Sequence, residues 1–151
     1  MSQEYILCLL LFGLFSLGVS VKGFYESSKK RNAYGEVILL TPLGIFVWGD
    51  AAIFGIFWFL AASISVLLLD VFLFPLIASL FVVVRSLGET IYWFNQQFSS
   101  ITREQPSGHR FLYKYFHNDS VWFVYQILNQ CLTVAGLVAS LYFAHMWLGQ
   151  F

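Results

Sequence analysis

Three charged residues lie within or beside stretches of the sequence that are otherwise almost entirely apolar. Arg85 and Glu89 are four positions apart, so a helix would place them on one face within pairing distance. If the two central apolar runs form a hairpin that turns at Asp70, Asp50 lies at the same depth as Glu89. Ionisable groups inside a membrane are costly and often functional. We therefore expect an Asp50–Arg85–Glu89 cluster, in which one guanidinium serves two carboxylates.

A second set of polar side chains recurs at helical spacing in the last apolar run. Its members are Gln126, Asn129, Gln130 and Thr133. A lipid-facing amide has no hydrogen-bond partner, so we expect this stripe to turn inward and meet the charged cluster. The polar residues of both sets are then candidates for an ion path, a hydrated vestibule that opens to the cytoplasm. The alternative is structural: the amides and hydroxyls hydrogen-bond one helix to another, and Arg85 forms an ion pair that sets the helix register.

The sequence contains no motif for catalysis or for a bound cofactor. Asp50 and Glu89 could form an acid and base pair, but a neighbouring Arg85 would hold both carboxylates ionised. His145 is the one histidine within an apolar run, and neither a thiol-pair zinc spacing nor a glycine-rich phosphate loop occurs. We expect no catalytic residue, no metal and no cofactor. An enzyme that acts on lipid at the inner leaflet is the least favoured of three functional hypotheses.

The elements that would position these residues follow from the composition. Of 151 residues, 59% are hydrophobic and 11% are charged, whereas about 25% are charged in soluble domains. A membrane-spanning helix needs about 20 apolar residues. Four runs meet this requirement, over residues 5–21, 49–69, 71–94 and 121–147. They predict an all-α polytopic membrane protein with a single transmembrane domain over residues 1–151, and a tight hairpin at Asp70 between the second and third helices.

The positive charges predict how this domain is oriented. Seven of the eight Lys and Arg residues lie in two loops, residues 22–48 and 95–120. Because cations are retained on the cytoplasmic side, both loops should be cytoplasmic, with the two termini and the hairpin turn outside. This asymmetry favours a bacterial inner membrane. Arg110 and Lys114 stand among aromatic residues, so we expect this part of the loop to contact the inner leaflet. The net charge of zero argues against a nucleic-acid partner.

Small residues in the first two apolar runs predict close helix packing. They are Gly13, Ser16, Ser20 and Gly23 in the first run, and Ala51 and Gly55 in the second. Each set lies on one helix face, and small side chains allow two backbones to approach. This contact could join helices within one chain or between subunits. The pattern favours a contact within the chain.

Residues 37–48 are mostly apolar but are interrupted by Thr41, Pro42 and Gly44. Proline removes a helix hydrogen bond, and glycine adds flexibility. The segment is therefore either an interfacial stretch that leads into the second span or a re-entrant broken helix. The first alternative is favoured.

The functional hypotheses follow from the size and the polar residues. Four spans enclose little volume alone, so a polar inner half favours a homo-oligomeric channel or transporter. The alternative is a non-catalytic accessory or assembly subunit of a larger membrane complex, for which short tails and an apolar surface are equally natural. In both cases the partners are the lipid bilayer and either further copies of the chain or other membrane subunits.

Overall fold

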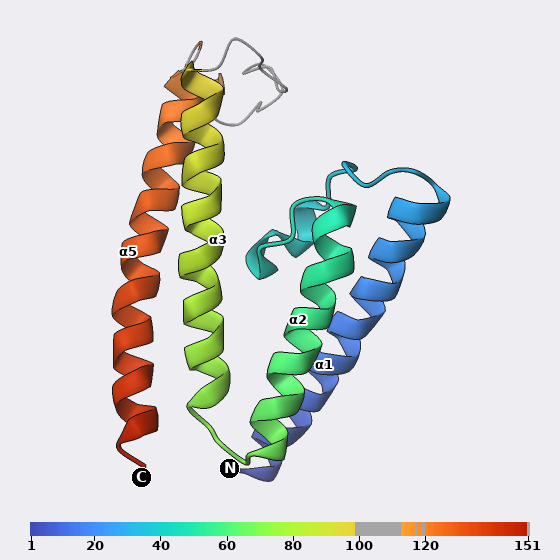
Figure 1. Ribbon diagram of the computed structural model, residues 1–151, viewed down its shortest axis with the longest axis vertical. Helices are drawn as coiled ribbons and strands as arrows, with labels where there is room; N and C mark the ends of the chain where they lie inside the picture. The colour runs from blue at the N-terminus through green and yellow to red at the C-terminus, as the bar shows by residue number, and fades with distance from the viewer. Residues whose placement is uncertain (99–112, 117, 119, 151) are drawn as a thin grey trace. The chain divides into compact units, whose positions relative to one another are not determined.

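The computed structural model describes residues 1–98, 113–116, 118 and 120–150. The regular secondary structure of these residues is helical apart from an isolated bridge between Glu36 and Val47, and turns and irregular segments connect the helices (Figure 1). Four of the described helices are long and apolar enough to cross a membrane: α1 (Gln3–Phe24), α2 (Trp48–Leu67), α3 (Leu73–Phe98) and α5 (Ser120–Leu148). This confirms the all-helical prediction of four apolar spans. It is consistent with an integral membrane location.

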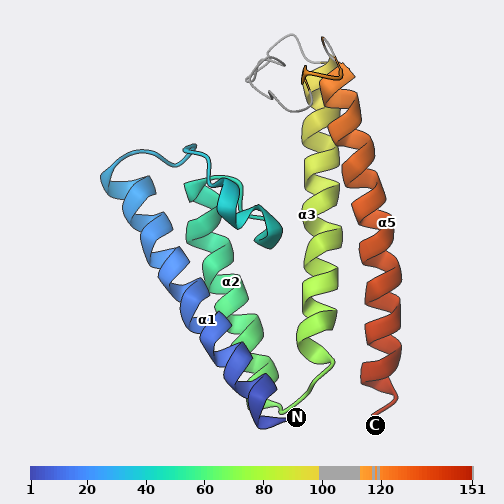
Figure 2. The same ribbon diagram turned by 180° about the vertical axis from the view of Figure 1, so that it is seen from behind.

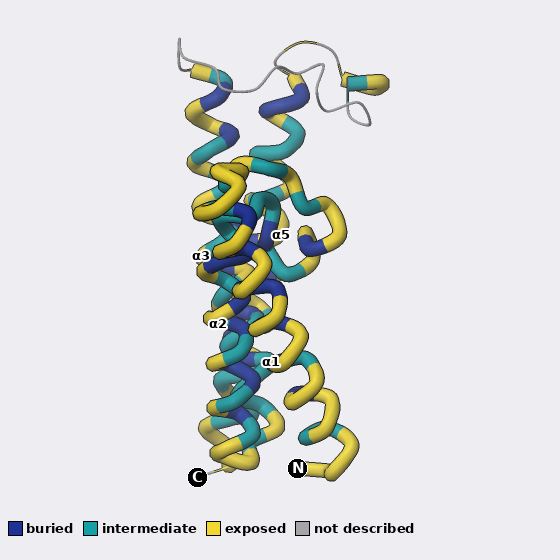
Figure 3. Tube along the Cα trace, turned by 90° about the vertical axis from the view of Figure 1, so that its right-hand side faces the viewer, coloured by how far each residue is buried: buried dark blue, intermediate teal, exposed yellow. Residues whose placement is uncertain are grey.

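The described contacts group into two compact units, Met1–Ile77 and Ala78–Gln150. The first unit contains α1, α2 and the segment that connects them. The second contains most of α3 together with α5. Along each helix, buried positions alternate with exposed ones, as expected for helices that pack on one side only (Figure 3).

In the first unit, α1 and α2 pack side by side in opposite directions (Figure 2). Ser2 caps the start of α1, because its hydroxyl accepts a hydrogen bond from the Tyr5 N–H at 3.3 Å. Glu4 in the first turn and Lys22 in the last turn both complement the helix dipole. A π-helical turn, η1 (Tyr25–Lys29), extends α1 toward the connecting segment.

The segment between η1 and α2 folds back on itself and contains a 3-10 helix, η2 (Ile38–Leu43). Gly44 ends η2 in the left-handed conformation at φ 70°, which favours glycine. The Val37 N–H then donates to the Phe46 carbonyl at 2.7 Å, which closes the two limbs of the segment. On its inner side, a core cluster of buried residues contains Leu40 and Ile45 of this segment with Val19 of α1 and Ala51 of α2.

Residues 68–72 connect α2 to α3, and Asp70 organises this turn. The Asp70 carboxylate accepts hydrogen bonds from the backbone N–H groups of Phe72 and Leu73, at 2.8 and 3.2 Å. These are donors that the first turn of a helix otherwise leaves unpaired, so Asp70 caps α3. Pro75 follows within the first turn of α3, where its missing N–H costs nothing. The turn predicted at Asp70 is therefore a defined cap.

In the second unit, α3 and α5 pack against each other. Trp93 stacks on Trp122 and Tyr125, with ring centroids 5.3 and 4.6 Å apart. At Gly136 an added Cβ would lie 3.0 Å from a methyl group of Val83, so the small residue lets the helices approach. Many of the remaining apolar side chains on both helices are exposed.

Candidate functional site

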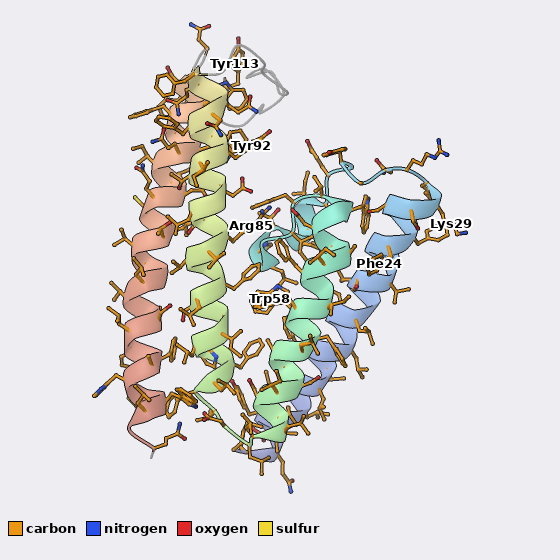
Figure 4. The ribbon with its side chains drawn as sticks, viewed as in Figure 1. Phe24, Lys29, Trp58, Arg85, Tyr92 and Tyr113 are labelled. Atoms are coloured by element: carbon orange, nitrogen blue, oxygen red, sulfur yellow. The ribbon has the colours of Figure 1, made fainter. Side chains whose placement is uncertain are left out.

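Arg85 and Glu89 form an ion pair on α3. Their Nη2 and Oε1 atoms are 3.0 Å apart, and 22% and 15% of the respective side chains are exposed (Arg85 is labelled in Figure 4). Each charge thus has an opposite charge one helical turn away, within a helix long enough to cross a membrane. Such a pair lowers the cost of holding two ionised groups in a span.

Asp50 belongs to the first unit, in the first turn of α2. Its Oδ2 atom accepts a hydrogen bond from the Phe46 N–H at 3.1 Å. A carboxylate near the start of a helix is also favoured by the helix dipole. Asp50 therefore fixes the chain where it enters α2. Because Arg85 and Glu89 belong to the second unit, the cluster of all three residues stays a prediction.

Three side-chain hydrogen bonds join α3 to α5, and we call them the α3–α5 ladder. They link Ser79 to Ser140 at 3.1 Å, Ser86 to Thr133 at 2.7 Å, and Gln97 to Gln126 at 2.7 Å. The four hydroxyl residues are buried, and the amide pair is partly buried. Two members of the predicted polar stripe, Gln126 and Thr133, thus have partners on the neighbouring helix. Their polar groups hold two helices together.

The other two members of the stripe differ from this pattern. Asn129 donates from Nδ2 to the Tyr125 carbonyl of its own helix, at 2.9 Å. Gln130 is exposed, and within the described residues its side chain makes no hydrogen bond or ion pair. It lines a shallow surface hollow of α5 whose other walls include Ile127 and Val134. An amide with no recorded partner therefore stands on an apolar helix surface.

The small residues of α1 lie against those of α2. A Cβ added at Gly55 would lie 2.6 Å from the Ser16 carbonyl oxygen and 2.7 Å from the Ser20 backbone nitrogen. A Cβ added at Gly23 would overlap the backbone nitrogen of Ala52. The buried Ser20 hydroxyl also donates to the Ala52 carbonyl, at 2.7 Å. Among the other small residues, Gly13 faces Ala62 and Ala51 lies beside Gly23. The two backbones are thus in direct contact.

The charged residues at the end of α1 and in the loops form local pairs. Lys22 lies over the Trp48 ring at 4.9 Å, and Lys30 donates from Nζ to Glu26 Oε1 at 2.8 Å. This hydrogen bond, together with the Glu26 charge, raises the pKa of Lys30 above its usual value. Lys114 is exposed and lies over the Tyr115 ring at 5.7 Å, while Arg110 lies outside the described residues. Leaflet contact by this loop stays a prediction.

Several residues that make these contacts were not expected from the sequence. Ser79, Ser86 and Trp93 recur at intervals of seven on α3, as do Gln126, Thr133 and Ser140 on α5. A seven-residue repeat is the signal of a helix-pairing seam, and it could have identified the two hydroxyl pairs of the ladder, whereas Gln97 lies outside the repeat. Gln96 is also buried, and its Oε1 atom has no hydrogen-bond partner. Its sequence neighbours offer no signal for that burial.

Most of the polar side chains described above hydrogen-bond within or between helices. No group of three or more His, Cys, Asp or Glu residues that could hold a metal ion occurs among the residues that the structure describes. The chain matches no protein-family model, no curated protein sequence and no solved structure.

Proposed function

We propose that this chain is a non-catalytic subunit of a membrane assembly, and that the exposed face of α5 around Gln130 is where another spanning helix packs. The observation that carries this proposal is the Gln130 amide, which has no partner among the described residues. Gln130 lies ten residues beyond Ser120, the first residue of α5, which is about 15 Å along the helix axis. At that depth water is scarce, and a hydroxyl or amide on a neighbouring helix is the available partner.

The α3–α5 ladder supports the same proposal. A water-filled vestibule needs polar groups that face an open space. Here Gln126 is hydrogen-bonded to Gln97 and Thr133 to Ser86, at 2.7 Å each. Asn129 donates a hydrogen bond to a carbonyl of its own helix. These bonds hold α3 and α5 together and leave Gln130 as the stripe member available to a further helix.

Native mass spectrometry of the protein, extracted gently from its own membrane, tests the proposal. We expect the wild type to carry other polypeptides at a defined mass. Gln130→Leu should reduce their occupancy roughly tenfold, because an interhelical hydrogen bond in a membrane contributes about 1–2 kcal/mol. The matched control is Gln126→Leu, which makes the same change at an amide already paired with Gln97. Gln126→Leu should lower the stability of the chain, but the other polypeptides should remain bound at wild-type occupancy. A wild type that is always isolated alone would contradict the proposal.

A homo-oligomeric channel or transporter is the second candidate, and the Arg85–Glu89 pair favours it. Both side chains keep some exposure within an apolar helix, as do charges that face a water path. Flux of monovalent ions into liposomes containing the purified chain tests this function. Arg85→Met should abolish flux, whereas Val84→Met, at an exposed neighbouring position, should not. Absence of flux in the wild type for every ion tested, or an equal effect of both variants, would reject it.

A further inference from the structure

The segment 36–47 reaches far along α2. The indole Nε1 of Trp58 donates to the Leu43 carbonyl of η2, at 3.0 Å (Figure 4, which labels Trp58). Trp58 is buried and lies ten residues beyond Trp48, the first residue of α2. Ten residues correspond to about 15 Å along a helix axis. Leu43 therefore packs beside the middle of α2.

The length of α2 determines what this contact means in a membrane. α2 has 20 residues, or about 30 Å, which matches the ~30 Å thickness of the hydrocarbon. If segment 36–47 lay flat at the interface, Trp58 would lie there too. The rest of α2, residues 59–67, would then be about 14 Å long, too short to span. The Trp58 ring leans toward the start of the helix. The ring therefore lies a few ångströms from the bilayer centre, on the side where α2 begins, and still well inside the hydrocarbon.

We infer that residues 36–47 form a re-entrant hairpin that enters and leaves the membrane on the same side, with the exposed side chains of η2 in contact with lipid acyl chains. The base of the hairpin supports a common side for both limbs. The Trp48 N–H donates to the Gly35 carbonyl at 3.1 Å, and the Gly49 N–H donates to the Ala33 carbonyl at 2.9 Å. The chain thus leaves the hairpin at the level where it entered. This inference is independent of the proposed assembly function.

The backbone of the hairpin is suited to an apolar environment. Non-helical backbone at membrane depth is tolerated where it is buried in protein, and the hairpin meets this condition because Leu40 and Ile45 are buried against Val19 of α1 and Ala51 of α2. Besides the Leu43 carbonyl, the hairpin pairs the Val37 N–H with the Phe46 carbonyl at 2.7 Å and the Gly44 N–H with the Thr41 carbonyl at 2.9 Å. Pro42 has no N–H to satisfy.

The side chains of the hairpin are equally suited to hydrocarbon. No charged residue occurs between Glu36 and Asp50. Ile38 and Leu39 at the start of η2 are 81% and 88% exposed. Two neighbouring aliphatic side chains with this exposure would be costly in water and are favourable among acyl chains. The hairpin therefore presents exposed apolar side chains on η2, the 3-10 helix whose last residue, Leu43, lies at the depth of Trp58.

Depth measurement by spin labelling tests this inference. The full chain with Cys8→Ser and Cys131→Ser, both free and exposed positions, receives a nitroxide at Leu39→Cys and is reconstituted into vesicles of phosphatidylcholine and phosphatidylglycerol. Tyr34→Cys, at a loop residue that is 84% exposed, and Leu60→Cys, at an exposed position of α2, serve as controls. We expect the Leu39 label to collide readily with oxygen and roughly tenfold less often than the Tyr34 label with a water-soluble nickel chelate, because hydrocarbon contains almost no water.

Two results would overturn the inference. A Leu39 label that meets nickel as often as the Tyr34 label would place the segment at the aqueous interface. A Leu39 label protected from both oxygen and nickel would show that protein, and not lipid, covers this side of η2. Ile38→Cys, at a second exposed position of η2, repeats the measurement independently. The unfolding transition of each unlabelled variant in detergent shows that the fold is retained.

Discussion

Replacing Gly55 with alanine tests whether direct backbone contact holds α1 against α2. The new Cβ would lie 2.6 Å from the Ser16 carbonyl oxygen and 2.7 Å from the Ser20 backbone nitrogen. Neither atom belongs to a flexible side-chain end, so the helices must separate by about 0.8 Å to reach ordinary van der Waals contact near 3.4 Å. The same displacement would stretch the 2.7 Å bond from the Ser20 hydroxyl to the Ala52 carbonyl toward its limit.

The expected loss of stability combines these two effects. Overpacking of a close contact costs about 1–3 kcal/mol, and weakening one buried hydrogen bond adds about 1 kcal/mol. Gly18→Ala is the matched control, because an added Cβ at Gly18 meets no atom within 4 Å. Both substitutions gain the same helix propensity, so that gain cancels in the comparison. We expect Gly55→Ala to be less stable than Gly18→Ala by about 3 kcal/mol, more than a hundredfold in the unfolding equilibrium.

Reversible unfolding of the purified chain in mixed micelles measures this difference. Sodium dodecyl sulfate is titrated against a mild detergent, and tryptophan fluorescence and circular dichroism follow the transition. Equal midpoints and slopes for Gly55→Ala and Gly18→Ala would refute the reasoning, because they would mean that the two backbones are not in contact at Gly55.

Three further substitutions address other contacts. Asp70→Ala should destabilise the chain by about 1 kcal/mol through loss of the α3 cap, while Asp70→Asn should retain most of the stability; equal losses in the same titration would contradict the cap. A double-mutant cycle of Ser86→Ala and Thr133→Val should give a coupling energy of roughly 0.6–1.7 kcal/mol, and zero coupling would exclude their hydrogen bond. Because Glu26 raises the pKa of Lys30, this pair stabilises the fold at neutral pH and ceases to do so as the pH rises through that raised pKa. Glu26→Gln should lower the Lys30 pKa in a nuclear magnetic resonance titration, and an unchanged value would contradict the pairing.

The spans could be predicted from the sequence because hydrocarbon thickness imposes a length on each apolar run. The structure places the ends of α2 and α3 on either side of Asp70, the one charged residue between them. Asp70 was expected only to separate two spans, yet it also caps α3. A charged residue at position 70, between two apolar runs, predicted the turn. The cap depends on the positions of the Phe72 and Leu73 N–H groups, which the sequence alone does not specify.

The polar contacts could be predicted only in part. Thr133 was expected to face inward, and it is buried against Ser86. Asn129 occupies the same stripe but bonds to its own helix, because an asparagine can satisfy its amide four residues back as well as across an interface. The partner of Asp50 could not be foreseen either. Its bond to Phe46 depends on the folded path of the hairpin, which Pro42 and Gly44 left open to two interpretations.

The α3–α5 ladder limits how these two helices could move. Its three bonds lie at separate heights along the pair, so a piston-like slide by one turn, about 5.4 Å, would break all of them together. Slides of one helical turn occur where a side chain can pack equally well in two positions one turn apart. Here two hydroxyl pairs are followed by one amide pair, and in this register each group faces a partner of its own kind. Any movement of α3 and α5 that keeps these bonds would therefore be a tilt or rotation of the two helices together as one rigid body.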